Sequence, residues 1–149
     1  MRATYKRELV AKEYLTGKGF EVFVPLRKVI KVVRGIKRKV TEPAIKGLIF
    51  VKGEREALKQ AKFGVEYLQY ITRKEGERNV PIIVPERQME QFIAVVQDDA
   101  VDKTFYIPDE VNITSRTKVR VHGGPFDGFE GVLVRIQGKR NKQFFINID

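Results

Sequence analysis

Residues 27–46 form the densest group of side chains in this sequence that could do chemistry, because eight are basic and only Glu42 is acidic. Valine and isoleucine alternate with the charges on both sides of Gly35, which predicts strands at 29–34 and 37–41 joined as a hairpin. Like charges on a narrow hairpin repel one another unless a polyanion lies near. Lysines that keep an exposed strand edge from aggregating are the alternative interpretation. The segment therefore predicts a nucleic-acid contact through Arg34, Lys37, Arg38 and Lys39.

The sequence offers no set of side chains suited to catalysis. It has no cysteine and a single histidine, His122, so it predicts neither disulfides nor a zinc site of the ordinary type. Asp98 and Asp99 are adjacent, and neighbours in sequence do not face one substrate. No Ser/His/Asp set, phosphate-binding loop or dinucleotide fingerprint is present. We therefore expect a protein that is not an enzyme and uses no metal or cofactor.

Charge is unevenly distributed along the 149 residues, which suit one ordinary domain or two small ones. Residues 1–99 carry 21 basic and 13 acidic side chains, residues 100–112 carry one and three, and residues 113–149 carry seven and three. This pattern predicts domains at 1–98 and 113–149 with a linker at 99–112. The net charge of +10 favours a polyanionic partner. The absence of cysteine, of a long apolar run and of a signal peptide predicts a cytoplasmic protein without membrane contact.

Hydrophobic periodicity predicts an α+β sandwich with a mostly antiparallel sheet, followed by a small β-barrel. The first predicted helix places Leu9, Val10, Ala11, Tyr14 and Leu15 on one face toward the core. The other predicted elements are strands at 21–26, 47–52, 65–72 and 80–84, a charged turn at 73–79, and helices at 7–18, at 54–62 and from Pro85 onward.

A glycine-rich break separates two alternating segments within residues 117–136, which predicts a hairpin with a closely packed turn. Its glycines, Gly131 included, allow positive φ, and Phe126 can cap the open end of a barrel. The string resembles the KOW motif, the strand–turn–strand unit of small SH3-like barrels; a hairpin of any other small barrel is the alternative. The residues of the predicted turn are Gly124, Pro125, Phe126, Gly128 and Gly131.

The order of motifs in residues 2–97 resembles the N-terminal domain of the NusG family of transcription elongation factors, and most of all its specialised paralogues of the RfaH and UpxY type. Ile45-Lys46-Gly47-Leu48 departs from the family's Phe-Pro-Gly-Tyr, and the first strand lacks tryptophan. Both ends look clipped by comparison, so we expect an incomplete KOW barrel. The matching motifs are Tyr5-Lys6-Arg7-Glu8, Phe23-Val24-Pro25-Leu26, Val33-Arg34-Gly35, Lys37-Arg38, Glu42-Pro43, Lys46-Gly47-Leu48-Ile49-Phe50-Val51 and Pro81-x-x-Val84-Pro85.

This resemblance implies two binding surfaces in the first domain. An apolar depression would bind the clamp of RNA polymerase, although the same residues could be the core of a central strand. The start of the first helix would meet the non-template DNA strand or nascent RNA, through Lys6, Arg7 and Lys12. The residues of the depression would be Ile45, Leu48, Phe50, Tyr67 and Tyr70.

The function that the resemblance implies is transcription elongation and antitermination, in which binding to the polymerase suppresses pausing or termination. The KOW domain would recruit a ribosomal protein or the termination factor Rho. A KOW-containing protein with a structural role in binding the ribosome or RNA is the alternative.

Overall fold

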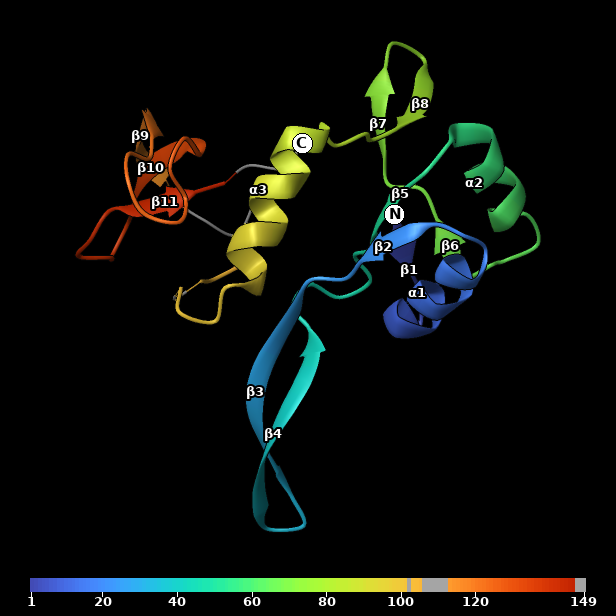
Figure 1. Cartoon of the computed structure of the whole chain (residues 1–149), viewed down its shortest axis with the longest axis horizontal. Helices are drawn as coiled ribbons and strands as arrows, with labels where there is room; N and C mark the ends of the chain where they lie inside the picture. Colours follow the sequence, from blue (N-terminus) through green and yellow to red (C-terminus); the bar gives the residue numbers. More distant parts are fainter. Residues whose placement is uncertain (102, 106–112, 147–149) are drawn as a thin grey trace. The chain divides into compact units, whose positions relative to one another are not determined.

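The computed structural model describes residues 1–101, 103–105 and 113–146, which form two compact units, Met1–Ile82 and Ile83–Asp149 (Figure 1). All strand pairs in the described residues are antiparallel, and the predicted α+β class is confirmed. The elements of the first unit are β1 (Arg2–Ala3), α1 (Glu8–Gly17), β2 (Glu21–Phe23), β3 (Leu26–Val33), β4 (Ile36–Pro43), β5 (Phe50–Lys52), α2 (Arg55–Lys62), β6 (Leu68–Gln69), β7 (Thr72–Glu75) and β8 (Arg78–Pro81). Those of the second are α3 (Glu86–Gln97), β9 (Ile113–Arg120), β10 (Glu130–Ile136) and β11 (Gln143–Phe145).

The predicted linker falls largely on residues that the structure does not describe, because residues 102 and 106–112 lie outside the described ranges. The division between the compact units comes earlier, at Ile82 and Ile83. Domains at 1–98 and 113–149 therefore stay a prediction.

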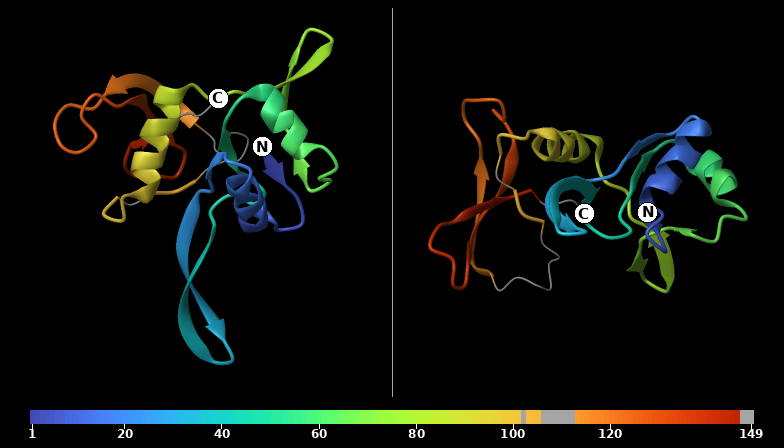
Figure 2. Two further views of the ribbon diagram at one scale, coloured as in Figure 1. Left: turned by 45° about the vertical axis from the view of Figure 1, so that its right-hand side comes forward. Right: turned by 90° about the horizontal axis from the view of Figure 1, so that it is seen from below.

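Strand pairs between distant parts of the sequence hold the first unit together. β1 pairs with β6 and β2 pairs with β5. Ala3, Ile49 and Leu68 are each at most 1% exposed. α1 and α2 lie side by side (Figure 2), and the Tyr14 hydroxyl donates a hydrogen bond of 2.8 Å to the carbonyl oxygen of Ala61. The buried cluster comprises Ala3, Ala11, Leu15, Val24, Ile49, Leu58 and Leu68.

α1 buries a narrower face than the one predicted. Ala11 and Leu15 are buried as expected, but Leu9 and Val10 are each 52% exposed. The third buried residue of the helix is Glu8. Positions spaced by three and four residues share one side of a helix, so burial of Glu8 with Ala11 and Leu15 turns the intervening apolar residues toward solvent.

Gly47 is buried and lies before β5. This strand begins at Phe50 and is therefore shorter than the predicted strand 47–52. The Glu8 carboxylate accepts a hydrogen bond of 2.6 Å from the Gly47 N–H. Ala3 N–H donates to the Gly47 carbonyl oxygen over 2.7 Å. Gly47 has φ of +74°, and a Cβ there would lie 3.1 Å from the Ala3 carbonyl oxygen. Glycine is therefore required on both conformational and steric grounds.

The chain after α2 folds differently from its prediction. The predicted strand 65–72 is reduced to β6, with β7 beginning at its last residue. The predicted turn 73–79 is instead the hairpin β7–β8, in which Glu75 pairs with Arg78 next to Gly76 at φ of +61°. The four residues of β7 are polar and exposed and lack the apolar alternation by which strands are recognised. Val80 and Pro81 of β8 are half-buried and fall within the predicted strand 80–84.

β3 and β4 form the long hairpin that the sequence predicts, and it extends away from the rest of its unit (Figures 1 and 2). The register runs without interruption to the Val33–Ile36 pair. Arg34 and Gly35 then connect the strands with φ of +52° and +78°. Positive φ at both central residues is the type I′ geometry, whose twist matches that of paired strands.

The second unit contains a three-stranded sheet in the order β11-β10-β9, in which Val134 and Ile136 are buried. This sheet does not close into a barrel within the described residues. α3 buries the apolar side chains of Phe92 and Val96, together with Gln91. The helix predicted from Pro85 onward begins at Glu86, and Pro85 occupies its N-cap position.

Candidate nucleic-acid and protein interfaces

The register of the β3–β4 hairpin divides its side chains between two faces. Directly opposite residues point to the same side of a strand pair, and the next pair points to the other side. We call the set Lys28, Ile30, Val32, Lys37, Lys39 and Thr41 the lysine face. We call the set Arg27, Val29, Lys31, Arg38, Val40 and Glu42 the glutamate face.

The predicted hairpin contacts are thereby separated. Lys37 and Lys39 share the lysine face, whereas Arg38 lies on the glutamate face. Arg34 occupies the turn between the strands. Nothing in the sequence distinguished these four cations. In the structure they occupy three different positions: the lysine face, the glutamate face and the turn.

Glu42 neutralises much of the charge on the glutamate face. One Glu42 oxygen lies 2.9 Å from Nη2 of Arg27, and the other forms an ion pair with Lys31. The hydrogen bond from Lys31, followed by that from Arg27, lowers the pKa of Glu42 below its ordinary value. Two of the three cations on this face thus already have an anionic partner.

The lysine face combines cations with exposed aliphatic side chains. Ile30 is 67% exposed and lies opposite Lys39, and Val32 is 65% exposed and lies opposite Lys37. This face carries no carboxylate, and within the described residues neither Lys37 nor Lys39 forms an ion pair. Each of these rungs therefore presents one apolar group and one ammonium group to solvent.

The predicted nucleic-acid contacts at the start of α1 are Lys6, Arg7 and Lys12, and all three are exposed. The Arg7 guanidinium carbon lies 5.2 Å from the centre of the Tyr67 ring, which is a cation–π arrangement. The structure thus places a predicted nucleic-acid contact against Tyr67, a predicted polymerase contact.

Tyr5 lies in an unusual turn immediately before α1. Arg7 N–H donates to the Thr4 carbonyl oxygen over 3.2 Å, and the two residues between them, Tyr5 and Lys6, both have φ of +57°. Residues other than glycine, asparagine and aspartate rarely adopt this backbone conformation. Tyr5 is 83% exposed. No sequence signal marked this turn, because the pattern of residue types does not specify positive φ here.

The predicted polymerase contacts on the central strand are only partly accessible. Ile49 is fully buried, whereas Ile45, Leu48 and Phe50 are half-buried. The Phe50 ring lies 6.4 Å from the ring of Phe23, its cross-strand partner in β2. Successive strand residues face opposite sides, so Leu48 and Phe50 point away from the core that holds Ile49. Their role in binding a partner stays a prediction.

Tyr67 and Tyr70 each have a cation over the ring. Lys62 lies 5.2 Å from the centre of the Tyr70 ring, as Arg7 does from that of Tyr67. Both tyrosines pack against the buried cluster, and burial raises the pKa of Tyr70. A basic group therefore borders each of the two tyrosines of the predicted depression.

Backbone and side-chain hydrogen bonds close the glycine-rich turn of the second unit. The Gly123 N–H donates to the Asp127 carboxylate over 2.6 Å, a contact that sequence reasoning missed. The Phe126 and Phe129 rings lie 5.3 Å apart. Pro125 is exposed. The predicted positive φ is confirmed at Gly123, Gly124 and Gly128.

Gly131 serves a different purpose from the one predicted. It lies in β10 and is not among the glycines with positive φ. A Cβ at this position would lie 2.5 Å from the Phe145 carbonyl oxygen and 2.6 Å from the ring of Phe144. Glycine here allows the close approach of β11.

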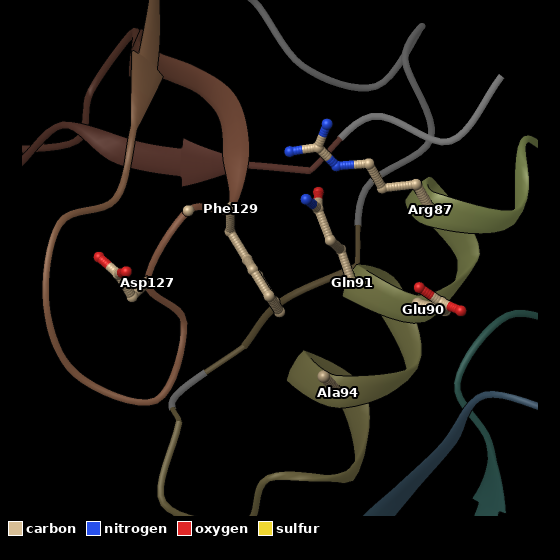
Figure 3. Close-up of a pocket in the computed structure, with 7 residues that line it drawn as sticks. Arg87, Glu90, Gln91, Ala94, Asp127 and Phe129 are labelled. Carbon is tan, nitrogen blue, oxygen red and sulfur yellow. The ribbon is translucent and has the colours of Figure 1, made fainter.

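A cleft of about 420 Å³ lies between α3 and the glycine-rich turn, with Arg87, Gln91 and Phe129 in its lining (Figure 3). Oε1 of Glu130 lies 3.9 Å from Nη2 of Arg87 and 2.5 Å from Nη2 of Arg120. The hydrogen bond from Arg120 lowers the pKa of Glu130. The lining mixes charged, amide and aromatic groups without a set suited to catalysis.

No cluster of three or more His, Cys, Asp or Glu side chains suited to a metal ion occurs in the described part of the chain. His122 is exposed beside the glycine-rich turn. The Asp98 carboxylate accepts a hydrogen bond from the backbone N–H of Ala100 over 2.9 Å, which closes an Asx turn directly after α3. Among the described helices, none has the length and apolar composition needed to cross a bilayer.

A comparison with known protein families finds a match that spans the whole first unit. Residues 1–93 match a family model described as "Transcription termination factor nusG". The match covers well over half of the chain and includes α1, the β3–β4 hairpin and all five predicted polymerase contacts.

Proposed function

The chain belongs to the NusG family of transcription factors, a family without enzymatic activity, and on this premise we propose that it acts in transcription elongation and antitermination by binding. The observation that carries the proposal is the β3–β4 hairpin, which extends from its unit and carries seven of the eight basic residues of segment 27–46. Concentrated positive charge on an exposed hairpin is stabilised by a nearby polyanion. DNA or RNA beside a transcribing polymerase provides one.

The proposed contact with RNA polymerase is made by the half-buried residues around β5. Leu48 and Phe50 point away from the core, and such aliphatic and aromatic side chains are suitable anchors for a helical clamp element. Ile45 and the tyrosines Tyr67 and Tyr70 would complete the depression. Binding there would hold the clamp closed and so disfavour pausing and termination.

The second unit is proposed to recruit a further partner through a KOW-type sheet. The three antiparallel strands and the turn closed by Asp127 support this assignment. The proposed partner is a ribosomal protein or the termination factor Rho. Within the family, we propose that the chain belongs with the specialised paralogues of the RfaH and UpxY type.

The direct test is binding to core RNA polymerase, which should co-elute with the purified full-length chain in gel filtration. Addition of the chain to a paused-transcription assay should then shorten pauses or increase read-through of a terminator. A Leu48→Asp variant should lose co-elution, while the exposed-site control Leu9→Asp should retain it. Failure of the unmodified chain to bind core polymerase would contradict the proposed function.

A further inference from the structure

We propose that the lysine face of the β3–β4 hairpin alone binds nucleic acid, and that its ligand is an unpaired strand held through successive phosphates. This inference rests on the proposed function, because it names the ligand and the contact face of the same hairpin. It divides the predicted contacts: Lys37 and Lys39 bind the strand, whereas Arg38 does not.

The first argument is the distribution of anionic partners. Glu42 is paired with Arg27 and Lys31 on the glutamate face. A phosphate that approaches this face would have to compete with the Glu42 carboxylate or be repelled by it. None of the six residues of the lysine face is Asp or Glu, and within the described residues Lys37 and Lys39 form no ion pair, so these two lysines attract a phosphate without competition.

The second argument is the aliphatic surface between the lysines. Ile30 and Val32 are about two-thirds exposed at 67% and 65%, more than Val33 or Ile36 on the other side at 46% and 57%. Covering apolar surface is favourable, at about 25 cal/mol per Å². A ligand that neutralises the ammonium groups and also covers these side chains combines regular negative charge with apolar surface, as a nucleic-acid strand does with its phosphates and its exposed sugars and unstacked bases.

The third argument is spacing. Rungs on the same face of a strand pair are two residues apart, about 7 Å, which is close to the separation of successive phosphates along one nucleic-acid strand. Lys37 and Lys39 lie on neighbouring rungs of this face. They are therefore placed to contact consecutive phosphates of a strand that runs along the hairpin.

The chemistry of the face favours an unpaired strand over a duplex or a protein. The six residues of the lysine face include no Asn or Gln to read adenine and no Arg to read guanine in the major groove; of the common base-reading side chains it carries only lysine, which also binds phosphates as a point charge. Its aliphatic groups reach the faces of bases only where the bases are unpaired. Lysine is also depleted at protein–protein interfaces, so a lysine-rich face is a poor match for a protein partner.

The test compares charge removal on the two faces in the full-length chain. Lys37→Gln with Lys39→Gln removes two charges from the lysine face, and Lys31→Gln with Arg38→Gln removes two from the glutamate face. Binding to a labelled single-stranded DNA of mixed sequence, and to RNA of the same sequence, is measured by fluorescence anisotropy across a salt series. Circular dichroism checks that each variant folds.

The lysine-face variant should bind roughly tenfold more weakly, with a log–log salt slope smaller by about 1.4, which corresponds to two lost single-strand phosphate contacts. The glutamate-face variant should keep the wild-type slope. Ile30→Ser with Val32→Ser should weaken binding severalfold without changing the slope, whereas Val33→Ser with Ile36→Ser should leave it unchanged.

Equal loss in both charge variants would overturn the face assignment while leaving nucleic-acid binding by the hairpin intact. Equal or tighter binding of a duplex competitor would overturn the unpaired-strand assignment. If the lysine-face variant keeps its nucleic-acid affinity but loses polymerase, the face is a protein contact and the inference is wrong. A wild-type chain that binds polymerase but no nucleic acid would overturn this inference and spare the polymerase part of the proposed function.

Discussion

At the scale of single residues, the buried Glu8 side chain links α1 to the chain at Gly47. Replacement by alanine would leave the Gly47 N–H without its acceptor, which costs about 1–3 kcal/mol. We expect Glu8→Ala to lower the free energy of unfolding by this amount, and Glu8→Gln by less because an amide oxygen still accepts. Urea denaturation measures both, with the exposed Glu13→Ala on the same helix as control. If Glu8→Ala unfolds with the same free energy as the wild type, the hydrogen bond makes no net contribution to stability.

The turn before α1 gives a second prediction at the residue scale. The left-handed conformation costs a non-glycine residue about 1–2 kcal/mol, and asparagine tolerates it better than tyrosine does. Since the Tyr5 ring is 83% exposed, its removal loses little packing. We expect Tyr5→Asn to raise the free energy of unfolding by up to about 1 kcal/mol.

Phe63 is the matched control for this prediction, because it is 89% exposed and has an ordinary φ of −58°. Phe63→Asn should therefore bring no comparable gain in the free energy of unfolding, which urea denaturation measures for both variants. If both asparagine variants are stabilised equally, the gain comes from removing an exposed aromatic ring and not from relieved backbone strain.

At the scale of elements, the residues around β5 alternate between a core side and the side of the proposed polymerase contact. Ile49 is fully buried, so Ile49→Ala should cost about 2–5 kcal/mol of stability. Leu48→Ala, on the opposite side, should cost less and should weaken retention of core RNA polymerase in gel filtration. Thermal unfolding distinguishes the two effects. Loss of folding in Leu48→Ala, or its full retention of polymerase, would remove Leu48 from the proposed interface.

At the scale of the whole molecule, the division of the chain is testable by limited proteolysis. The acidic composition and Pro108 of segment 99–112 predict that the first cut falls there and releases a fragment of roughly the first hundred residues. Mass spectrometry identifies the cut. α3 belongs with the second compact unit, Ile83–Asp149, in which its Phe92 ring lies 6.4 Å from that of Phe105. A first cut near Ile83 would therefore contradict the predicted boundary.

Features of this protein that depend on neighbours in sequence were predictable from the sequence. The β3–β4 hairpin, the approximate bounds of the helices and the positive φ of Gly123, Gly124 and Gly128 all arise from local alternation, helical spacing or the conformational freedom of glycine. The concentration of positive charge in 27–46 is likewise independent of folding. The same local reasoning failed at β7, because its polar and exposed residues carry no apolar signal.

Contacts between distant residues were decided only by the tertiary structure. Burial of Glu8 depends on Gly47, 39 residues away, and the cation over Tyr67 comes from Arg7 across the β1–β6 pairing. Gly131 is required by the approach of β11, which residue type alone does not reveal. The sequence by itself determined which cations the hairpin carries. The pairing register decided which of them share a face with Glu42, because a shift of one residue in register moves every side chain to the other side of the strand pair.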